Sequence, residues 1–213
     1  RIAPTFDKTG RAAIQVGHKI MATERITFTG HGGDTLAARL DLPDGAHLGT
    51  ALFAHCFSCS KDIPAARRIS ARLAAMGLAV LRFDFTGLGH SEGDFANTSF
   101  TSNVDDLVAA GKYLEDRGMP AGLLIGHSLG GAAVLMAAQH IQSVKAVATI
   151  GAPFDPAHVT HNFAGSLDEI DRAGQAEVNL GGRPFVIGRE FERDVAAANL
   201  VPAIAGLKRA LLV

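Results

Sequence analysis

Short apolar segments alternate with longer amphipathic ones along the chain from about residue 24 onward. Apolar runs bounded by Gly, Pro or Asp are typical of strands buried on both faces, whereas apolar residues spaced three or four positions apart indicate helices. The alternation predicts an α/β fold in three layers, α/β/α, with a mostly parallel, twisted sheet in the middle. The expected strands are 25–29, 36–42, 50–55, 78–83, 121–125, 144–150 and 209–213.

Three helices are expected between these strands. The first follows Asp62, whose carboxylate can cap it, and Pro64 suits its first turn. The second begins near the capping signal that Ser102 forms with Asp105. The third is rich in small residues and is expected over 129–140.

The pattern changes after the sixth strand, in residues 155–206. Stretches that carry histidines and charges surround a strand pair, 176–180 and 184–187, which turns at Gly181-Gly182. We expect this segment to leave the sheet as an inserted lid, before the chain returns to the sheet near its end.

The first 20 residues contain no apolar core of the kind that a secretory signal requires, and residues 21–25 resemble a natural protein start. We therefore expect a flexible extension over 1–20 and one domain over 21–213. The missing export signal also predicts a cytoplasmic protein with reduced thiols, so we expect no structural disulfide between its two cysteines.

Composition narrows the classes of partner. Hydrophobic residues make up 47% of the chain and charged residues 19%, which is an ordinary globular balance. The formal net charge is -1 and the two signs are interspersed, so no nucleic-acid partner is expected. The apolar runs are far shorter than the ~20 residues that cross a bilayer, so no membrane partner is expected either.

Gly126-His127-Ser128-Leu129-Gly130 lies between an apolar strand and a helix of small residues, the context that a nucleophile elbow requires. A serine at the apex of so tight a turn adopts a strained backbone, and Gly126 and Gly130 leave room for the neighbouring strand and helix. The helix N-terminus favours negative charge that develops there. The pattern predicts Ser128 as a nucleophile, with His127 pointing away from its hydroxyl. The alternative is a glycine-rich turn that happens to contain a serine.

The loop after the third strand is expected to complete an oxyanion hole. By position, the backbone N–H groups of Phe57 and Leu129 are the predicted donors, and His55 is expected to bond the loop backbone. Cys56 and Cys59 are interpreted as small, half-buried residues of a tight loop. A zinc site is the less favoured alternative, because His55 is the obvious third ligand and zinc needs about four. A reactive thiol beside a helix N-terminus stays open.

A third motif, 84–93, ends the fourth strand, and its Asp84 is expected to bond loop backbone. With 55–62 and 126–131, it stands in an order and at spacings similar to α/β-hydrolases of the serine-aminopeptidase-like group. The segments 54–57, 126–131 and 150–153 also resemble bacterial hydrolase domains that are often fused to a C-terminal OsmC-like domain. The resemblance implies a cytoplasmic hydrolase without cofactor or metal, a small-molecule acyl substrate, and such a C-terminal domain as a partner in the full protein.

The same resemblance implies a triad in the order Ser, then Asp or Glu, then His, with the last two in loops after the seventh and eighth strands. The sequence ends at Val213, within the expected seventh strand. We therefore expect the acid, the base, and the last strands and helices of the fold to be missing. Asp155 is the best candidate for a resident acid, with His158 and His161 near it, although one short loop accommodates these roles poorly.

The leading hypothesis is a serine hydrolase that cleaves carboxylic esters or amides through an acyl-enzyme, inactive or weakly active as this fragment. Phe154, Phe163 and Leu167 would shape its acyl pocket, although each taken singly could equally be core. The alternative is a non-catalytic, truncated domain that binds a small ligand or a partner domain. A third hypothesis is a redox module that uses Cys56 and Cys59.

Overall fold

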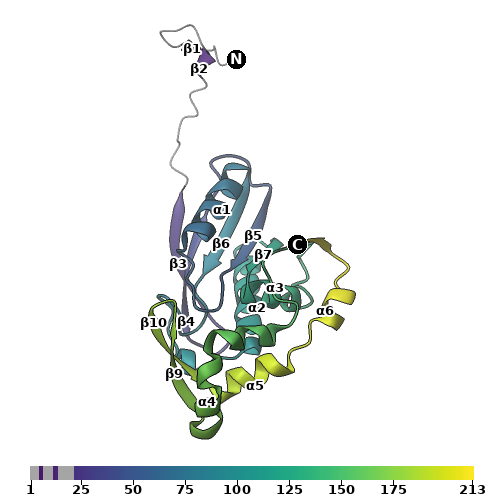
Figure 1. The fold of residues 1–213 in the computed structure, drawn as a ribbon. Helices are drawn as coiled ribbons and strands as arrows, with labels where there is room; N and C mark the ends of the chain where they lie inside the picture. Colours follow the sequence, from purple (N-terminus) through teal and green to yellow (C-terminus); the bar gives the residue numbers. More distant parts are fainter. Residues whose placement is uncertain (1–4, 7–11, 14–21) are drawn as a thin grey trace.

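The computed structural model describes residues 5–6, 12–13 and 22–213 of the chain. The expected extension lies outside the described residues, apart from β1 (Thr5–Phe6) and β2 (Ala12–Ala13), which pair antiparallel. All other described elements belong to the continuous stretch 22–213, shown in colour in Figure 1.

A seven-stranded sheet forms the centre of the molecule, in the order β11-β8-β7-β5-β6-β4-β3 (Figure 1). The five neighbouring strands β11, β8, β7, β5 and β6 pair in parallel, and β4 is antiparallel to both of its neighbours. The predicted mostly parallel sheet is confirmed. The strands are β3 (Thr23–Thr29), β4 (Thr35–Asp41), β5 (Gly49–Ala54), β6 (Leu78–Phe83), β7 (Ala121–His127), β8 (Ala146–Ile150) and β11 (Ala210–Leu212).

Helices cover both faces of the sheet, as the sequence predicts: α1 (Pro64–Ala75) on one, α2 (Phe100–Asp116) and α3 (Leu129–Ala137) on the other. The alternation along β5 shows why, because Leu52 belongs to the core under α2 and α3 whereas Phe53 packs with α1. Successive side chains of a strand point to opposite faces, so an all-apolar strand requires cover on both. Within the part of the chain that the structure describes, no helix has both the length and the apolar composition needed to cross a membrane.

Two helix starts differ from the sequence-based predictions. Asp62 does not cap α1, because its carboxylate accepts a hydrogen bond from Arg82 Nη1 (2.7 Å) instead. The α2 helix begins one turn earlier than Ser102 and Asp105 suggested, since Ser99 is its cap and exchanges hydrogen bonds with Ser102 in a capping box. In both cases the side chain bonds a residue that the sequence-based prediction did not consider: Arg82 for Asp62, and Ser99 for Ser102.

Between β8 and β11 the chain leaves the sheet, as predicted for residues 155–206. The hairpin turns at Gly181 and Gly182, both with positive φ (60° and 84°), a conformation that glycine adopts without strain. The elements of this excursion are η2 (Pro156–Ser166), α4 (Leu167–Ala173), β9 (Gln175–Leu180), β10 (Arg183–Gly188), α5 (Arg189–Ala197) and α6 (Val201–Ala205).

Aromatic side chains attach the excursion to the rest of the molecule. Phe191 of α5 stacks on Phe57 of the loop after β5, with ring centroids 4.8 Å apart, and Phe163 of η2 lies 6.2 Å from Phe57. A second contact joins Phe185 of β10 to Phe95 in η1 (Phe95–Asn97), at 5.3 Å. These aromatic contacts hold the excursion against the loop that carries Phe57 and against η1.

Replacing Phe191 by Ala should lower the free energy of unfolding by about 3–5 kcal/mol, because the side chain is 2% exposed and its removal leaves a cavity. Phe154→Ala, at a position that is 69% exposed, is the matched control and should change stability by no more than about 0.5 kcal/mol. Urea unfolding monitored by circular dichroism measures both. Equal losses for the two variants would contradict this account of how the excursion is held.

Candidate active site

Ser128 occupies the turn between β7 and α3 in a backbone conformation that is rare for a residue with a side chain, with φ 53° and ψ −127°. Such a conformation costs about 1–3 kcal/mol and persists only where the surroundings impose it. Here the Ser128 N–H donates to the Ile150 carbonyl (2.9 Å), and its own carbonyl accepts from the Gly131 N–H (2.8 Å). The turn is thus held to β8 on one side and to the first turn of α3 on the other.

The two glycines that flank the serine are required by close backbone contacts. A Cβ at Gly126 would collide with the backbone of Gly130 and Gly131, and a Cβ at Gly130 would collide with the carbonyl oxygens of His55 and Ala54. The end of β7, the start of α3 and the end of β5 therefore approach more closely than any side chain allows. This contact explains why Ser128 is held above the ends of the parallel strands.

A pocket of about 670 Å³ opens beside Ser128. Its walls come from the loop after β5, the start of α3, the segment after β8, η2 and the tip of the β9–β10 hairpin. Phe57, Leu129 and His158 line it together with Ser128. The structure therefore brings the predicted serine and both predicted oxyanion residues to one cavity. Among the described residues that line it there is no Asp, Glu, Lys or Arg.

The apolar walls differ from those expected. Phe154, Phe163 and Leu167 do not line the pocket, and Val159 and Leu180 do so instead. Phe163 is 4% exposed and is used in the aromatic contact with Phe57, whereas Phe154 is 69% exposed. The local pattern predicted the hairpin itself, but it gave no sign that the tip of the hairpin, with Leu180, lines the pocket.

His55 is buried at the start of the loop after β5, where its Nδ1 donates to the Cys56 carbonyl (2.8 Å), as expected for a residue that bonds loop backbone. Its ring packs edge-on against Phe85, at 4.9 Å between centroids. Burial lowers the pKa of His55 below its usual value and outweighs the hydrogen bond to Cys56 and the charge of Asp84, which act the other way. Burial therefore favours the neutral form of this ring, whose contacts with Cys56 and Phe85 hold the start of the loop in place.

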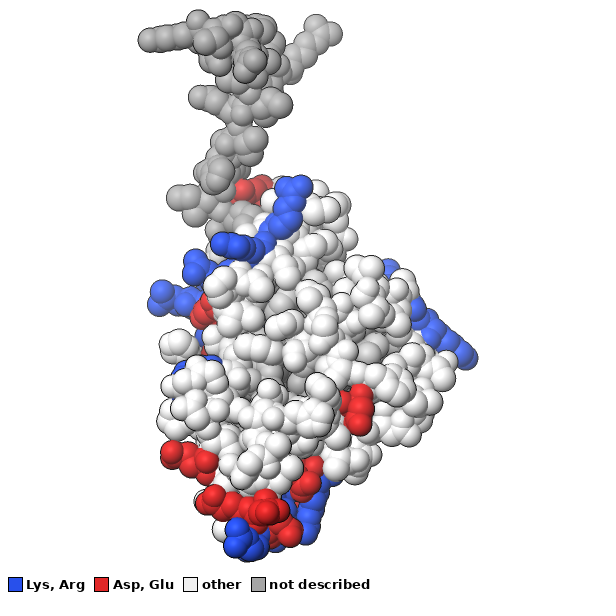
Figure 2. All heavy atoms as spheres, in the orientation of Figure 1, with Lys and Arg blue, Asp and Glu red and all other residues white. Residues whose placement is uncertain are grey.

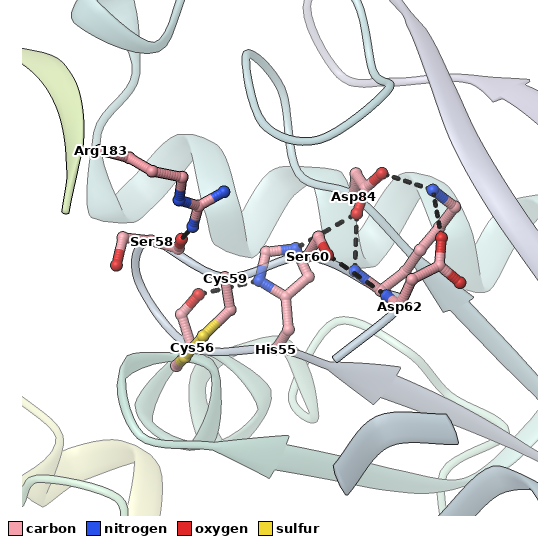
Figure 3. The surroundings of a disulfide bond; sticks show 9 residues. His55, Cys56, Ser58, Cys59, Ser60, Asp62, Asp84 and Arg183 are labelled. Atoms are coloured by element: carbon pink, nitrogen blue, oxygen red, sulfur yellow. Dashed lines mark hydrogen bonds and ion pairs between the residues drawn. A yellow bond between two sulfur atoms is a disulfide. The ribbon is translucent and has the colours of Figure 1, made fainter. Parts of the chain in front are cut away.

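Asp84 anchors the same loop through the hydrogen bonds drawn beside it in Figure 3. Its carboxylate is buried and accepts from the Lys61 N–H (2.6 Å), from Lys61 Nζ (2.6 Å) and from the His90 N–H (2.9 Å). The predicted bonding of Asp84 to loop backbone is confirmed. Lys61, which is only 3% exposed, was missed, because a lysine in a polar loop gives no sign in the sequence that it will be buried against a carboxylate.

The prediction that the two cysteines stay apart is wrong: Cys56 and Cys59 are joined in a disulfide (Figure 3). The Cys59 N–H donates to the Cys56 carbonyl (3.1 Å), and this turn brings the two Cα atoms to 5.2 Å, within the range that a disulfide spans. Arg183, at the start of β10, donates to the carbonyl of Ser58 inside this short ring. In the part of the chain that is described, no three metal-ligating side chains cluster, at this pair or elsewhere.

The side chains of the candidate acid and of the two histidines near it do not form a catalytic pair. Asp155 is exposed and accepts from the Ala157 N–H (3.0 Å), which caps η2. The rings of His158 and His161 pack edge to face, 4.5 Å between centroids. The His158 N–H donates to the Asp155 carbonyl (3.1 Å), but within residues 22–213 no hydrogen bond joins the Asp155 carboxylate to a histidine ring, or a histidine ring to the Ser128 hydroxyl. Nδ1 of His127 is buried and has no partner among these residues.

The lowered pKa of His55 makes fold stability depend on pH. An unfolded histidine has a pKa of about 6.5, and between that value and the lower folded value the unfolded chain binds more protons. The free energy of unfolding should therefore fall as pH drops below about 6.5, by at most about 1.4 kcal/mol per pH unit from this residue.

Urea unfolding at pH 5.5, 6 and 7 measures that slope. His55→Asn, which keeps a donor for the Cys56 carbonyl, should flatten the slope, whereas His140→Asn at an exposed helix end should leave it unchanged. The same slope in His55→Asn and in the unsubstituted chain would show that His55 is not the responsible group.

Comparisons with known proteins agree with this geometry. The family model described as serine aminopeptidase, S33, matches residues 62–172. The structure of an esterase domain from a Rhodothermus marinus protein is 46% identical, with a TM-score of 0.68, over 90% of this chain and 75% of that one. Est1E of Butyrivibrio proteoclasticus, solved with ferulic acid bound, is 20% identical, with a TM-score of 0.69, over 87% and 76% of the two chains, and shows the fold.

A lidless α/β serine hydrolase from Xanthomonas campestris is 26% identical over 62% of each chain, with a TM-score of 0.56. A search of curated protein sequences found no match. The family match covers more than half of the chain, and the esterase domain matches nearly all of it at high identity. The chain therefore belongs to the α/β-hydrolases, in the serine aminopeptidase (S33) family.

Proposed function

We propose that this hydrolase cleaves carboxylic esters through an acyl-enzyme formed on Ser128. The observation that carries the proposal is the strained turn itself, which sets Ser128 on the wall of the pocket at the N-terminus of α3. In this mechanism Ser128 Oγ attacks the ester carbonyl carbon, the alcohol leaves, and water then releases the acid. Amides would follow the same steps with an amine as the leaving group.

Two backbone N–H groups support the assignment of an oxyanion hole. Among residues 22–213, neither the Leu129 N–H nor the Phe57 N–H has a hydrogen-bond acceptor, although both residues are buried and line the pocket. Buried N–H groups are nearly always paired, so a free pair beside Ser128 is suited to bind an oxygen that gains negative charge. The first N–H groups of a helix lack partners within the helix, which makes Leu129 available.

The substrate class follows from the walls of the pocket. The described lining contains no Asp, Glu, Lys or Arg, and Phe57, Val159 and Leu180 supply apolar surface. An uncharged acyl group fits this lining better than an acidic or basic one, because a charged group would be buried without a counter-charge. An ester with a neutral acyl chain is therefore the proposed substrate, in line with the esterase domain that this chain resembles.

General-base catalysis is the step that residues 22–213 support least. His158 shares the pocket but packs on His161 and has no carboxylate bonded to it within these residues. We propose that the acid and base of the triad come from outside the described residues and that these 213 residues alone turn esters over weakly. A site that keeps its oxyanion hole and lacks its base retains only ~10³–10⁴-fold acceleration over water.

A fluorophosphonate probe tests the nucleophile. The 213-residue chain should form one slow adduct, located at Ser128 by peptide mass spectrometry, and should hydrolyse p-nitrophenyl acetate above the spontaneous rate. Ser128→Ala should abolish the adduct and lower the rate of hydrolysis. Ser166→Ala, at a helix start where the side chain makes no capping hydrogen bond, should change neither. An adduct that survives in Ser128→Ala, or a chain that stays unlabelled after prolonged exposure, would favour a non-catalytic, ligand-binding domain.

A further inference from the structure

A second groove, of about 960 Å³, lies beside α1 on the β6–β4–β3 side of the sheet, and no residue lines both it and the Ser128 pocket. Five arginines line it, and we call it the arginine groove. Figure 2 shows several Lys and Arg side chains, with Asp and Glu side chains among them, on the part of the surface where Figure 1 places α1 and β3. The five are Arg25 of β3, Arg39 of β4, Arg82 of β6, and Arg67 and Arg68 of α1.

Strand register sets three of these arginines in one row. Arg25 lies directly opposite Arg39, and Arg39 lies directly opposite Arg82. Residues opposite one another in a sheet point to the same face, here the face that α1 covers farther along. Like charges in such positions repel and destabilise a sheet, so the row requires negative charge close by.

Two carboxylates line the groove, and both are already engaged. Asp41 Oδ2 accepts from Arg82 Nε (2.8 Å) and Asp62 Oδ1 from Arg82 Nη1 (2.7 Å). The second oxygen of Asp62 faces Lys61 Nζ at 3.2 Å. Burial alone would raise the pKa of Asp62, but the hydrogen bonds from Arg82 and Lys61 outweigh it and lower that pKa. Arg39 Nε reaches Asp62 only at 3.8 Å, so Arg82 and Lys61 hold most of the negative charge.

The other arginines leave the groove with surplus positive charge. Among the described residues, no carboxylate lies within ion-pair distance of Arg25, Arg67 or Arg68, so five guanidinium groups face two carboxylates. Arg67 and Arg68 also follow the first turn of α1, which holds no acidic residue and whose N-terminus is itself positive. The row and the helix end thus concentrate positive charge at one place by two separate routes.

We propose that the arginine groove binds a small molecule that carries two linked phosphate groups. Guanidinium groups present forked pairs of donors that match phosphate oxygens, and an excess of three positive charges suits a diphosphate better than a single carboxylate. The groove is large enough for such a ligand and is separate from the Ser128 pocket. Binding there relieves the repulsion between Arg25 and Arg39, which Asp62, at 3.8 Å from Arg39 Nε and already bonded to Arg82, offsets only in part.

Isothermal titration of the 213-residue chain with inorganic pyrophosphate, at low ionic strength, tests the proposal. We expect saturable binding at one site, weaker binding of inorganic phosphate, and affinity that falls as salt is added. The double variant Arg25→Gln/Arg67→Gln should bind at least about tenfold more weakly, because it loses two charge-assisted contacts. The control Arg72→Gln/Arg193→Gln removes the same charge from exposed positions outside the groove and should bind within about twofold of the unsubstituted chain.

Melting temperatures in phosphate-free buffer separate a binding role from a structural one. Without ligand, Arg25→Gln/Arg67→Gln should be as stable as the unsubstituted chain or more stable, because it removes repulsion. Pyrophosphate should raise the melting temperature of the unsubstituted chain and of Ser128→Ala alike. No binding at millimolar pyrophosphate, equal weakening in both double variants, or a lower melting temperature of Arg25→Gln/Arg67→Gln without ligand would each overturn the proposal.

Discussion

The buried carboxylate of Asp84 is the contact on which both sites depend. A fully buried charge is costly, and it is tolerated here because Lys61 supplies a backbone N–H and an ammonium group and His90 a second N–H. These bonds join the loop after β6 to the loop after β5. The second loop carries Phe57, so the wall of the Ser128 pocket is located by a charge pair behind it. The Lys61 carbonyl also accepts from Arg82 (2.7 Å), which links the pair to the floor of the arginine groove.

Backbone contact at the turn supplies the second constraint. Glycines on both sides of Ser128 let β5, β7 and α3 approach until the serine has no relaxed conformation available. The excursion between β8 and β11 contacts this backbone through side chains: Phe191 stacks on Phe57, and Arg183 donates to the Ser58 carbonyl. Rigid backbone thus holds the serine, whereas side-chain packing shapes the walls around it. Changes in the excursion can alter the walls without moving the serine.

Sequence patterns predicted the strands, the α1 start at Pro64, the hairpin and the serine turn, because each rests on neighbours in the chain. They failed where a distant group competed for the same side chain. Asp62 was expected to cap a helix and is held by Arg82, and Phe163 was expected at the pocket and is held by Phe57 and Phe191. The prediction for the two cysteines failed for another reason. It was based on cellular redox conditions, which do not describe how a turn brings two side chains together.

The sequence by itself determined the α/β layering and the position of Ser128 between a strand and a helix, because hydrophobic period and glycine placement act over a few residues. Only the tertiary structure decided that Arg25, Arg39 and Arg82 stand in one row. In the chain these charges are dispersed among acids and gave no sign of an anion site. Strand register collects them, and a slip of one residue would turn each side chain to the other face of the sheet. The net charge of a sequence averages over all its residues, whereas a binding site depends on which charged side chains the fold places together.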